Sequence, residues 1–257
     1  MSSAWRGSST SARQRTLTTR GDTVNPYYAD EAEAVALYHG DALAVVDAVV
    51  PRNTVHTVLT DPPFALPARQ YAGRSESWQR AWADTSILAT WWGLVAETLT
   101  ARVRADGHLM AFCDHTSYPV FYPAIYTRWP LVVGLTWDKQ RPGMGSAWRA
   151  SSELVIAARG RSAYWAGGAK GTVLRHPPVR AADRVHPVDK PVPLLEDLLA
   201  ATTPAGGLVL DPFAGGGSTV LAARNLGMRV IAVEAEERYC EVVARRLVQS
   251  HRPPSHE

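Results

Sequence analysis

The feature that most constrains the fold of this chain is a glycine-rich segment at residues 211–219, which reads DPFAGGGST. It follows an apolar run at 207–211 that is typical of a buried strand, and it precedes a helical pattern at 220–227. A second strand is expected at 228–234. A strand, a glycine-rich turn, a helix and a strand make a nucleotide-type βαβ unit, in which glycines let the backbone approach a ligand closely. We therefore expect an α/β fold with a mostly parallel sheet covered by helices on both faces.

The acidic residues around this turn indicate which kind of ligand it binds. Glu234 lies 23 residues after Asp211, near the spacing of an acid that holds ribose hydroxyls. The chain has neither a GxxxxGK[ST] phosphate loop nor the GxGxxG spacing of dinucleotide-binding folds. Because Asp211 enters the turn, a pyrophosphate is disfavoured and a cationic or zwitterionic ligand is favoured. S-adenosylmethionine (SAM), which has an ammonium, a sulfonium and a ribose, fits this description.

A second turn, DPPF at residues 61–64, ends the β-branched run VHTVLT at 55–60. A strand must end at two prolines, because proline cannot join the hydrogen-bond ladder. The Asp61 carboxylate and the Pro62 carbonyl are two acceptors that suit an exocyclic amine, and Phe64 offers a face for stacking a planar base. In open α/β sheets ligands bind at the carboxyl ends of the strands, where this turn lies.

The rest of the chain alternates between expected helices and strands. Only 13 residues separate the expected strands 131–138 and 152–159, which favours an antiparallel pair over a helical crossover. Residues 1–25 are expected to be a flexible basic tail, and 65–84 a long loop. The other expected elements are helices at 42–50, 85–104, 116–128, within 186–204 and at 237–248, and a strand at 107–114.

The charge of the chain is concentrated in one segment. Residues 139–185 hold nine basic and two acidic residues, whereas the whole chain has a net charge of +3. Such a segment fits a polyanionic partner such as nucleic acid, although a solvated charged loop explains the charge equally well. The candidate DNA-contacting residues are Lys139, Arg141, Arg149, Arg161, Lys170 and Arg175.

Other classes of protein are excluded by composition. The two cysteines, Cys113 and Cys240, cannot form a disulfide framework, and no cysteine or histidine cluster offers a metal site. No apolar run is long enough to span a membrane, and no signal segment opens the chain. A cytoplasmic protein with neither a metal nor a membrane partner is therefore expected.

Taken together, VLTDPPF at 58–64, HPVDKP at 186–191 and VLDPFAGGGST at 209–219 resemble the β group of SAM-dependent DNA amino-methyltransferases. The resemblance covers roughly residues 36–248 and implies SAM as methyl donor and a flipped base in double-stranded DNA as acceptor. It also implies a Rossmann-like, seven-stranded mixed sheet with one antiparallel strand and a circularly permuted motif order. Residues 26–257 would form a single domain with a short target-recognition segment around 139–185. A role in restriction–modification follows from the resemblance, and a homodimer is left open.

The resemblance assigns roles residue by residue. The residues expected to act on the base are Asp61, Pro62, Pro63 and Phe64. Glu234 would hold the SAM ribose, Asp41 would lie near the adenine, and His186 with Lys190 would close the side of the SAM carboxylate. The remaining residues expected to bind SAM are Asp211, Pro212, Phe213, Ala214, Gly215, Gly217, Ser218 and Thr219.

The target atom is predicted from the first position of the DPPF turn. Methylation of cytosine C5 needs a cysteine nucleophile, usually after proline, and neither cysteine here follows a proline. Asp61 favours the N6 amine of adenine, because the cytosine-N4 enzymes more often carry serine at that position. Cytosine N4 remains the main alternative, followed by RNA or protein amide methylation and by a non-catalytic DNA-binding module.

Overall fold

The computed structural model describes residues 17–19, 22–32, 34–63, 84–143, 147–185 and 189–249. Their main feature is a nine-stranded sheet in the order β3-β4-β11-β10-β5-β6-β8-β7-β9. The strands are β3 (Tyr28–Asp30), β4 (Val35–His39), β5 (Val55–Thr60), β6 (Val103–Cys113), β7 (Leu131–Asp138), β8 (Ser152–Arg159), β9 (Val173–Arg175), β10 (Leu208–Asp211) and β11 (Arg229–Glu234). The mixed α/β architecture that the sequence predicts is confirmed.

The number of strands corrects the prediction of seven. The added strands are β3, which folds back antiparallel on β4, and β9, which pairs in parallel with β7 inside the basic segment 139–185. Each has three residues, which is too short for a periodic pattern to be recognised. The predicted antiparallel strand is β8, which runs against both β6 and β7. Because β3 is also antiparallel, the sheet has two such strands.

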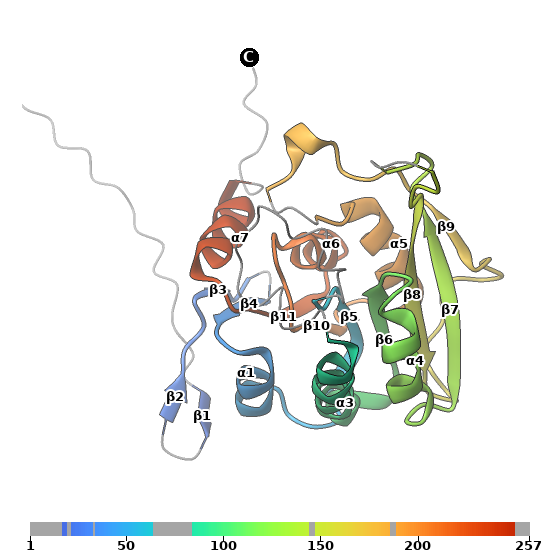
Figure 1. Cartoon of the computed structure of the whole chain (residues 1–257). Helices are drawn as coiled ribbons and strands as arrows, with labels where there is room; N and C mark the ends of the chain where they lie inside the picture. Colours follow the sequence, from blue (N-terminus) through green and yellow to red (C-terminus); the bar gives the residue numbers. More distant parts are fainter. Residues whose placement is uncertain are drawn as a thin grey trace, which may run out of the picture.

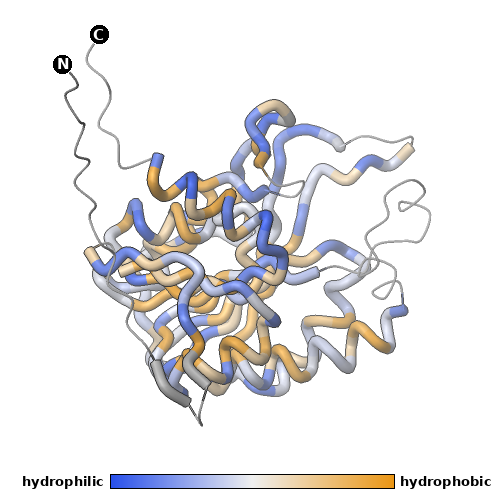
Figure 2. Tube along the Cα trace, turned by 90° about the vertical axis from the view of Figure 1, so that its left-hand side faces the viewer, coloured by the Kyte–Doolittle hydropathy of each residue, from blue (hydrophilic) through white to orange (hydrophobic). Residues whose placement is uncertain are grey.

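Helices cover both faces of the sheet. Figure 1 shows α1, α3 and α4 below the sheet and α5, α6 and α7 above it. Their bounds are α1 (Ala42–Val49), α3 (Thr85–Arg102), α4 (Tyr118–Tyr126), α5 (Val192–Thr202), α6 (Ser218–Asn225) and α7 (Glu237–Gln249). The central strands consist mainly of hydrophobic residues (Figure 2), as is typical of strands that are covered on both faces. Each face of the sheet has its own apolar cluster.

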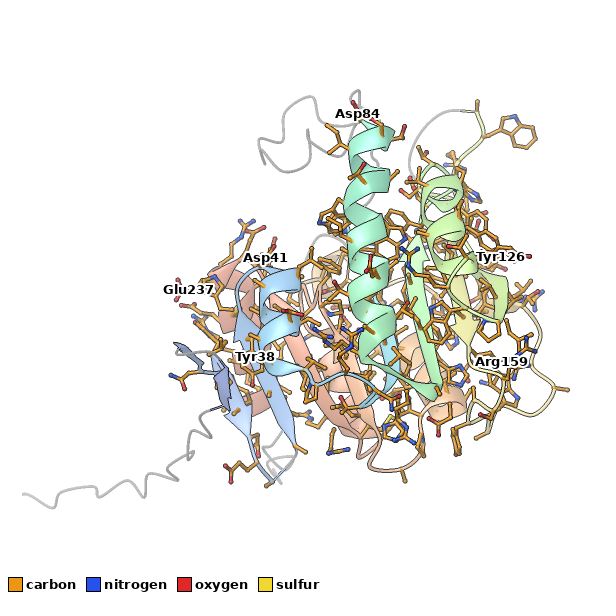
Figure 3. The ribbon with its side chains drawn as sticks, turned by 90° about the horizontal axis from the view of Figure 1, so that it is seen from below. Tyr38, Asp41, Asp84, Tyr126, Arg159 and Glu237 are labelled. Carbon is orange, nitrogen blue, oxygen red and sulfur yellow. The ribbon has the colours of Figure 1, made fainter. Side chains whose placement is uncertain are left out.

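The parallel strands all end at one edge of the sheet, here called the carboxyl edge. Several helices begin at this edge. Asp41 begins α1 and accepts the backbone N–H of Ala44 at 2.9 Å, and Asp84 begins α3 and accepts that of Ser86 at 2.8 Å. Figure 3 shows both residues at the upper ends of their helices, and Arg159 lower in the view. Arg159 marks the opposite edge, because it pairs with Leu131 at the start of β7.

The segment expected to be a flexible tail contains a short strand pair. β1 (Leu17–Thr19) and β2 (Asp22–Val24) pair antiparallel as a separate two-stranded sheet. The rest of the expected tail up to residue 16 lies outside the described residues. Within the described residues, no helix is long and apolar enough to cross a membrane.

Candidate active site

The two turns that the sequence singles out lie side by side at the carboxyl edge. β5 and β10 are parallel neighbours, with Leu210 opposite Val58. Thr60, the last residue of β5, donates a hydrogen bond from Oγ1 to Oδ1 of Asp211 at 3.0 Å, and both side chains are buried. Asp61 follows Thr60 directly, so the start of the DPPF turn and the start of the glycine-rich turn share one site.

The glycine-rich turn is shaped by left-handed backbone. Gly215 has a φ angle of 50° and Gly217 has a φ angle of 80°, values that residues other than glycine rarely adopt. Gly217 begins α6, and a Cβ atom there would lie 2.8 Å from both Cγ atoms of Val243 on α7. The turn is therefore fixed by the close approach of two helices as well as by its own backbone conformation.

The two acids expected to hold the nucleoside end of the cofactor also lie at this edge. Glu234 ends β11 and accepts the backbone N–H groups of Gly215 and Glu236, each at 2.8 Å. The N–H of Gly40 donates to the Glu234 carbonyl at 3.0 Å, which holds the adjoining Asp41 beside the end of β11. Burial raises the pKa of Glu234, and the two backbone hydrogen bonds oppose that shift.

Asp211 is a buried carboxylate that keeps several hydrogen bonds. Besides Thr60, the N–H of Phe213 donates to Oδ1 at 3.1 Å. Burial raises the pKa of Asp211 to about 6, and the nearby charge of Asp61 adds to that rise. The hydroxyl of Thr219 and the other hydrogen bonds lower the pKa in part. A cationic ligand next to Asp211 would therefore relieve an unfavourable buried charge.

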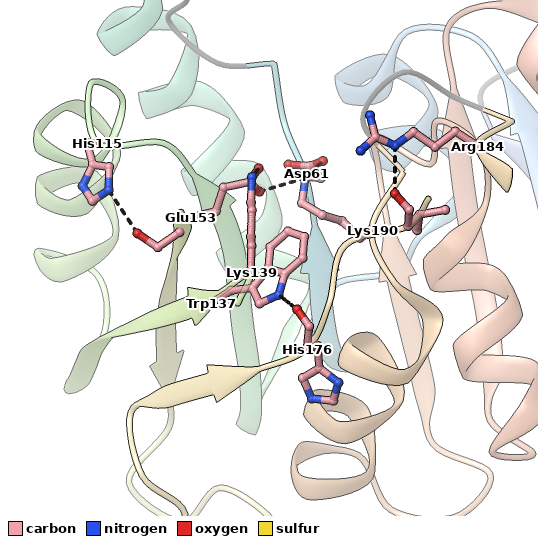
Figure 4. Close-up of polar contacts among 10 residues, drawn as sticks. Asp61, His115, Trp137, Lys139, Glu153, His176, Arg184 and Lys190 are labelled. Atoms are coloured by element: carbon pink, nitrogen blue, oxygen red, sulfur yellow. Dashed lines mark hydrogen bonds and ion pairs between the residues drawn. The ribbon is translucent and has the colours of Figure 1, made fainter. Parts of the chain in front are cut away.

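Asp61 belongs to a row of alternating charges. Its Oδ2 atom pairs with the ammonium of Lys190, which also lies 3.3 Å from Oε2 of Glu153. The other oxygen of Glu153 accepts from Nζ of Lys139 at 2.6 Å (Figure 4). Burial raises the pKa of Asp61 to about 6; Lys190 lowers it and Glu153 raises it. The Oδ1 atom of Asp61 is buried and has no hydrogen-bond partner among the described residues.

Lys190, which is expected to close the SAM carboxylate side, pairs in this structure with two acids. Its ammonium pairs with Asp61 and Glu153, and it lies 5.1 Å from the centre of the Phe112 ring. Only 6% of the Lys190 side chain is exposed, and a buried ammonium needs carboxylates nearby to compensate its charge. The sequence reasoning did not single out Glu153. A charged residue near the start of the apolar strand SELVIAAR was the available signal.

The other predicted site residues differ in whether the structure describes them and in how deeply they are buried. Phe64 and His186 lie outside the described residues. Pro62 is buried and Pro63 half-buried in the turn after β5. The ring of Phe213 lies 5.6 Å from that of Trp91 on α3. The residues of the glycine-rich segment that are buried are Asp211, Pro212, Ala214, Gly216, Gly217, Ser218 and Thr219.

The basic segment does not form a single surface. Arg141 and Arg149 are exposed on the connection between β7 and β8 at the carboxyl edge, where Trp148 is fully exposed. Arg175 lies at the same edge, 3.9 Å from Asp138. Arg161 follows the end of β8 and therefore lies at the opposite edge.

The two lysines of the basic segment are engaged by acids. Lys170 pairs with Asp197 on α5, and Lys139 points inward to Glu153. Of the six predicted DNA contacts, Arg141 and Arg149 thus combine exposure with a position at the site edge, and Arg175 does so while lying 3.9 Å from Asp138. An engaged or distant side chain is a poor candidate for a phosphate contact at this site.

Comparison with known proteins points to one family. Residues 146–245 match the family described as DNA methylase. YubD of Escherichia coli (strain K12), which is named as a candidate methylase, is 28% identical over 226 residues, covering 83% of this chain and 90% of that protein. The type II methyltransferase M2.LlaDCHI of Lactococcus lactis subsp. cremoris is 24% identical over 263 residues, covering 86% of this chain and 91% of its own length.

Solved structures share the fold. The M1.HpyAVI–SAM complex superposes with a TM-score of 0.61 at 22% identity, covering 82% of this chain and 99% of the other. PvuII DNA methyltransferase, described as cytosine-N4-specific, gives a TM-score of 0.68 at 16% identity, with 90% of each chain covered. The mixed α/β sheet of this chain is thus the fold that these two structures share.

The family match indicates which kind of methyltransferase this chain resembles. Residues 146–245 are thus similar to the DNA methylase family, and type II methyltransferases are among the relatives of the chain.

Proposed function

We propose that this protein transfers a methyl group from SAM to the N6 amine of an adenine flipped out of double-stranded DNA. The observation that carries the proposal is the Oδ1 atom of Asp61, a buried acceptor without a hydrogen-bond partner among the described residues. Leaving such an atom unpaired costs free energy, which a donor from the substrate would recover. An exocyclic amine supplies that donor beside the turn expected to hold the methyl donor.

The residues around the glycine-rich turn fit SAM. Asp211 and Glu234 place two carboxylates at neighbouring strand ends, and Gly215 leaves the backbone open to close approach. Carboxylate oxygens can accept more than the hydrogen bonds described here, so both acids can also bind a ligand. Asp211 would face the cationic methionine end and Glu234 the ribose hydroxyls. When bound, SAM supplies a methyl group activated by the positive charge of its sulfonium.

The protein's own part in the reaction is to position the amine. Oδ1 of Asp61 and the carbonyl of Pro62 would each accept one amine hydrogen, which points the nitrogen lone pair toward the methyl carbon. The nitrogen–carbon bond would form as the carbon–sulfur bond breaks and a neutral thioether leaves. The cationic nitrogen would then pass one of its protons to Oδ1 of Asp61, which releases it to water. Because an aromatic amine is a weak nucleophile, orientation supplies much of the rate. Base extrusion costs a few kcal/mol, which contacts with the DNA backbone must offset.

The same geometry would serve the N4 amine of cytosine, which is therefore the second candidate. One observation favours it: the structure of an enzyme described as cytosine-N4-specific superposes over 90% of this chain. The aspartate at position 61 favours adenine, and we retain adenine as the proposal.

Incubation with SAM labelled in the methyl group and duplex DNA, followed by digestion to nucleosides, tests the proposal. Label in N6-methyl-2′-deoxyadenosine is the expected result. Label in N4-methyl-2′-deoxycytidine would replace adenine by the second candidate. Label confined to RNA or protein offered in parallel, or absent from all three, would reject DNA methylation by this chain.

A further inference from the structure

We propose that Glu153 and Lys190 are positioning residues for Asp61, holding one of its oxygens so that the other faces the target amine. The inference deepens the proposed function and rests on it. It assigns a role to Glu153, a residue outside the two turns, and gives Lys190 a role toward the substrate rather than toward SAM.

The geometry assigns different tasks to the two oxygens of Asp61. Oδ2 is held by the Lys190 ammonium, and Oδ1 has no partner among the described side chains and backbone groups. An aspartate side chain can rotate about two bonds, and each fixed rotation costs conformational entropy. A carboxylate already held through Oδ2 does not lose that freedom when the amine binds, which is how preorganisation increases rate.

Glu153 holds Lys190 in turn. It lies near the start of β8, between Lys139 from the end of β7 and Lys190 from the segment that leads into α5. Its two oxygens contact one lysine each, at 2.6 Å and 3.3 Å. In Figure 4, Glu153 and Lys139 lie on one side of Asp61, and the side chain of Lys190 reaches Asp61 from the other side. The two lysines balance the two carboxylates, so the row is neutral when all four groups are ionised.

Fold stability is a poor explanation for this row. Replacing buried ion pairs by apolar residues is often neutral or stabilising, because desolvation offsets the attraction between the charges. Lys190 is 6% exposed and the Glu153 side chain 19%, so both have lost most of their hydration. The row includes Asp61, which lies at the candidate site, and this position fits a role in the reaction.

The row also predicts how each partner affects ionisation of Asp61. Lys190 and Lys139 lower the pKa of Asp61, and Glu153 raises it. Two further groups face it, since Asp61 raises the pKa of both Asp211 and Cys113. Loss of Lys190 should therefore raise the pKa of Asp61, and loss of Glu153 should lower it. A role in folding alone gives no reason for opposite shifts.

Single-turnover methylation of duplex DNA, measured from pH 5 to 9 in Glu153→Gln and Lys190→Met, tests the inference. Glu196→Gln is the matched control, because Glu196 binds Asn225 away from the row. Both test variants should lose at least about tenfold in rate, while SAM and DNA affinities stay within about threefold of wild type. The acid limb should move to lower pH in Glu153→Gln and to higher pH in Lys190→Met. Lys190→Arg should restore part of the rate.

Carbon-13 NMR titration of Asp61 gives a second readout that needs no substrate. The pKa of Asp61 should fall in Glu153→Gln and rise in Lys190→Met, with Glu196→Gln unchanged. Shifts in the same direction, or wild-type rates in both variants, would overturn the inference. Inactive wild-type protein would instead reject the proposed function, and the NMR result would then still decide whether the row controls Asp61.

Discussion

Thr60 and Asp211 are joined by a hydrogen bond of 3.0 Å between neighbouring strands, although 151 positions separate them in the sequence. The bond connects the residue before Asp61 to the first acid of the glycine-rich turn. Through it, the site expected to hold the methyl donor is connected to the site expected to hold the acceptor. The relative position of the two turns is thus determined by pairing within the sheet and not by a mobile loop.

Thr60→Val should weaken this connection while keeping the shape of the side chain. We expect a loss of about 1 kcal/mol in the free energy of unfolding, from the removed hydrogen bond. SAM affinity should fall by about 3- to 10-fold, because the Asp211 carboxylate becomes less constrained. Chemical denaturation and isothermal titration calorimetry measure the two effects.

Thr57→Val is the control for Thr60→Val. Thr57 is also buried on β5, away from the carboxyl edge. Its hydroxyl donates a hydrogen bond to the Thr202 carbonyl and accepts one from the Thr203 hydroxyl. It should lose similar stability without weakening SAM binding. Equal loss of SAM affinity in both variants would show that Thr60 acts only through general stability.

Asp211→Asn should separate stability from cofactor binding. The pKa of Asp211 is about 6 in the folded protein, above its ordinary value of 3.8, so the folded state disfavours the charged form. The charged Asp211 carboxylate therefore destabilises the folded state. This destabilisation is absent below pH 3.8, grows between pH 3.8 and pH 6, and is complete above pH 6, where it is on the order of 1 to 3 kcal/mol. The melting temperature of the variant relative to wild type should thus be higher at pH 8 than at pH 4.

The same substitution should lower SAM affinity at least about tenfold, because the neutral amide loses its attraction for the cationic methionine end. Calorimetry at pH 8 measures this loss. A melting temperature relative to wild type that is no higher at pH 8 than at pH 4, together with normal SAM binding, would contradict both assignments of Asp211.

DNA affinity should depend on the arginines at the carboxyl edge. Arg141→Gln and Arg149→Gln should each weaken binding of duplex DNA and reduce the slope of log affinity against log salt by about 1. Arg161→Gln is the matched control, since Arg161 follows β8 at the opposite edge. Fluorescence anisotropy over a salt series gives the slopes. An effect of Arg161→Gln equal to the other two would place the DNA on a different face.

The sequence contained enough to predict the central architecture and the two turns. Strands such as 55–60 and 207–211 are apolar runs that end abruptly, the first at prolines and the second at an acid followed by proline. Those stops place Asp61 and Asp211 at strand ends by local rules alone. Parallel pairing then brings strand ends to one edge, so the meeting of the turns followed from topology.

The partners of charged side chains could not be predicted in the same way. The resemblance implies that Lys190 closes the SAM carboxylate side, but its short motif says nothing about where the side chain points. Its ammonium instead contacts Asp61 and Glu153, which are 129 and 37 positions away in the sequence. Such contacts depend on how β8 and the segment before α5 are packed, and a single sequence shows no pattern for that. The strands β3 and β9 were missed because three residues show no period.

Asp61→Ala tests the central claim most directly, namely that the methyl donor and the target amine meet at one edge with Asp61 on the side of the amine. SAM binding is measured by calorimetry and methyl transfer to duplex DNA by single-turnover assay, on the same preparation as wild type. The account predicts SAM affinity within about threefold of wild type and transfer lower by at least about 100-fold. Transfer at the wild-type rate, or loss of SAM binding in step with transfer, would contradict it.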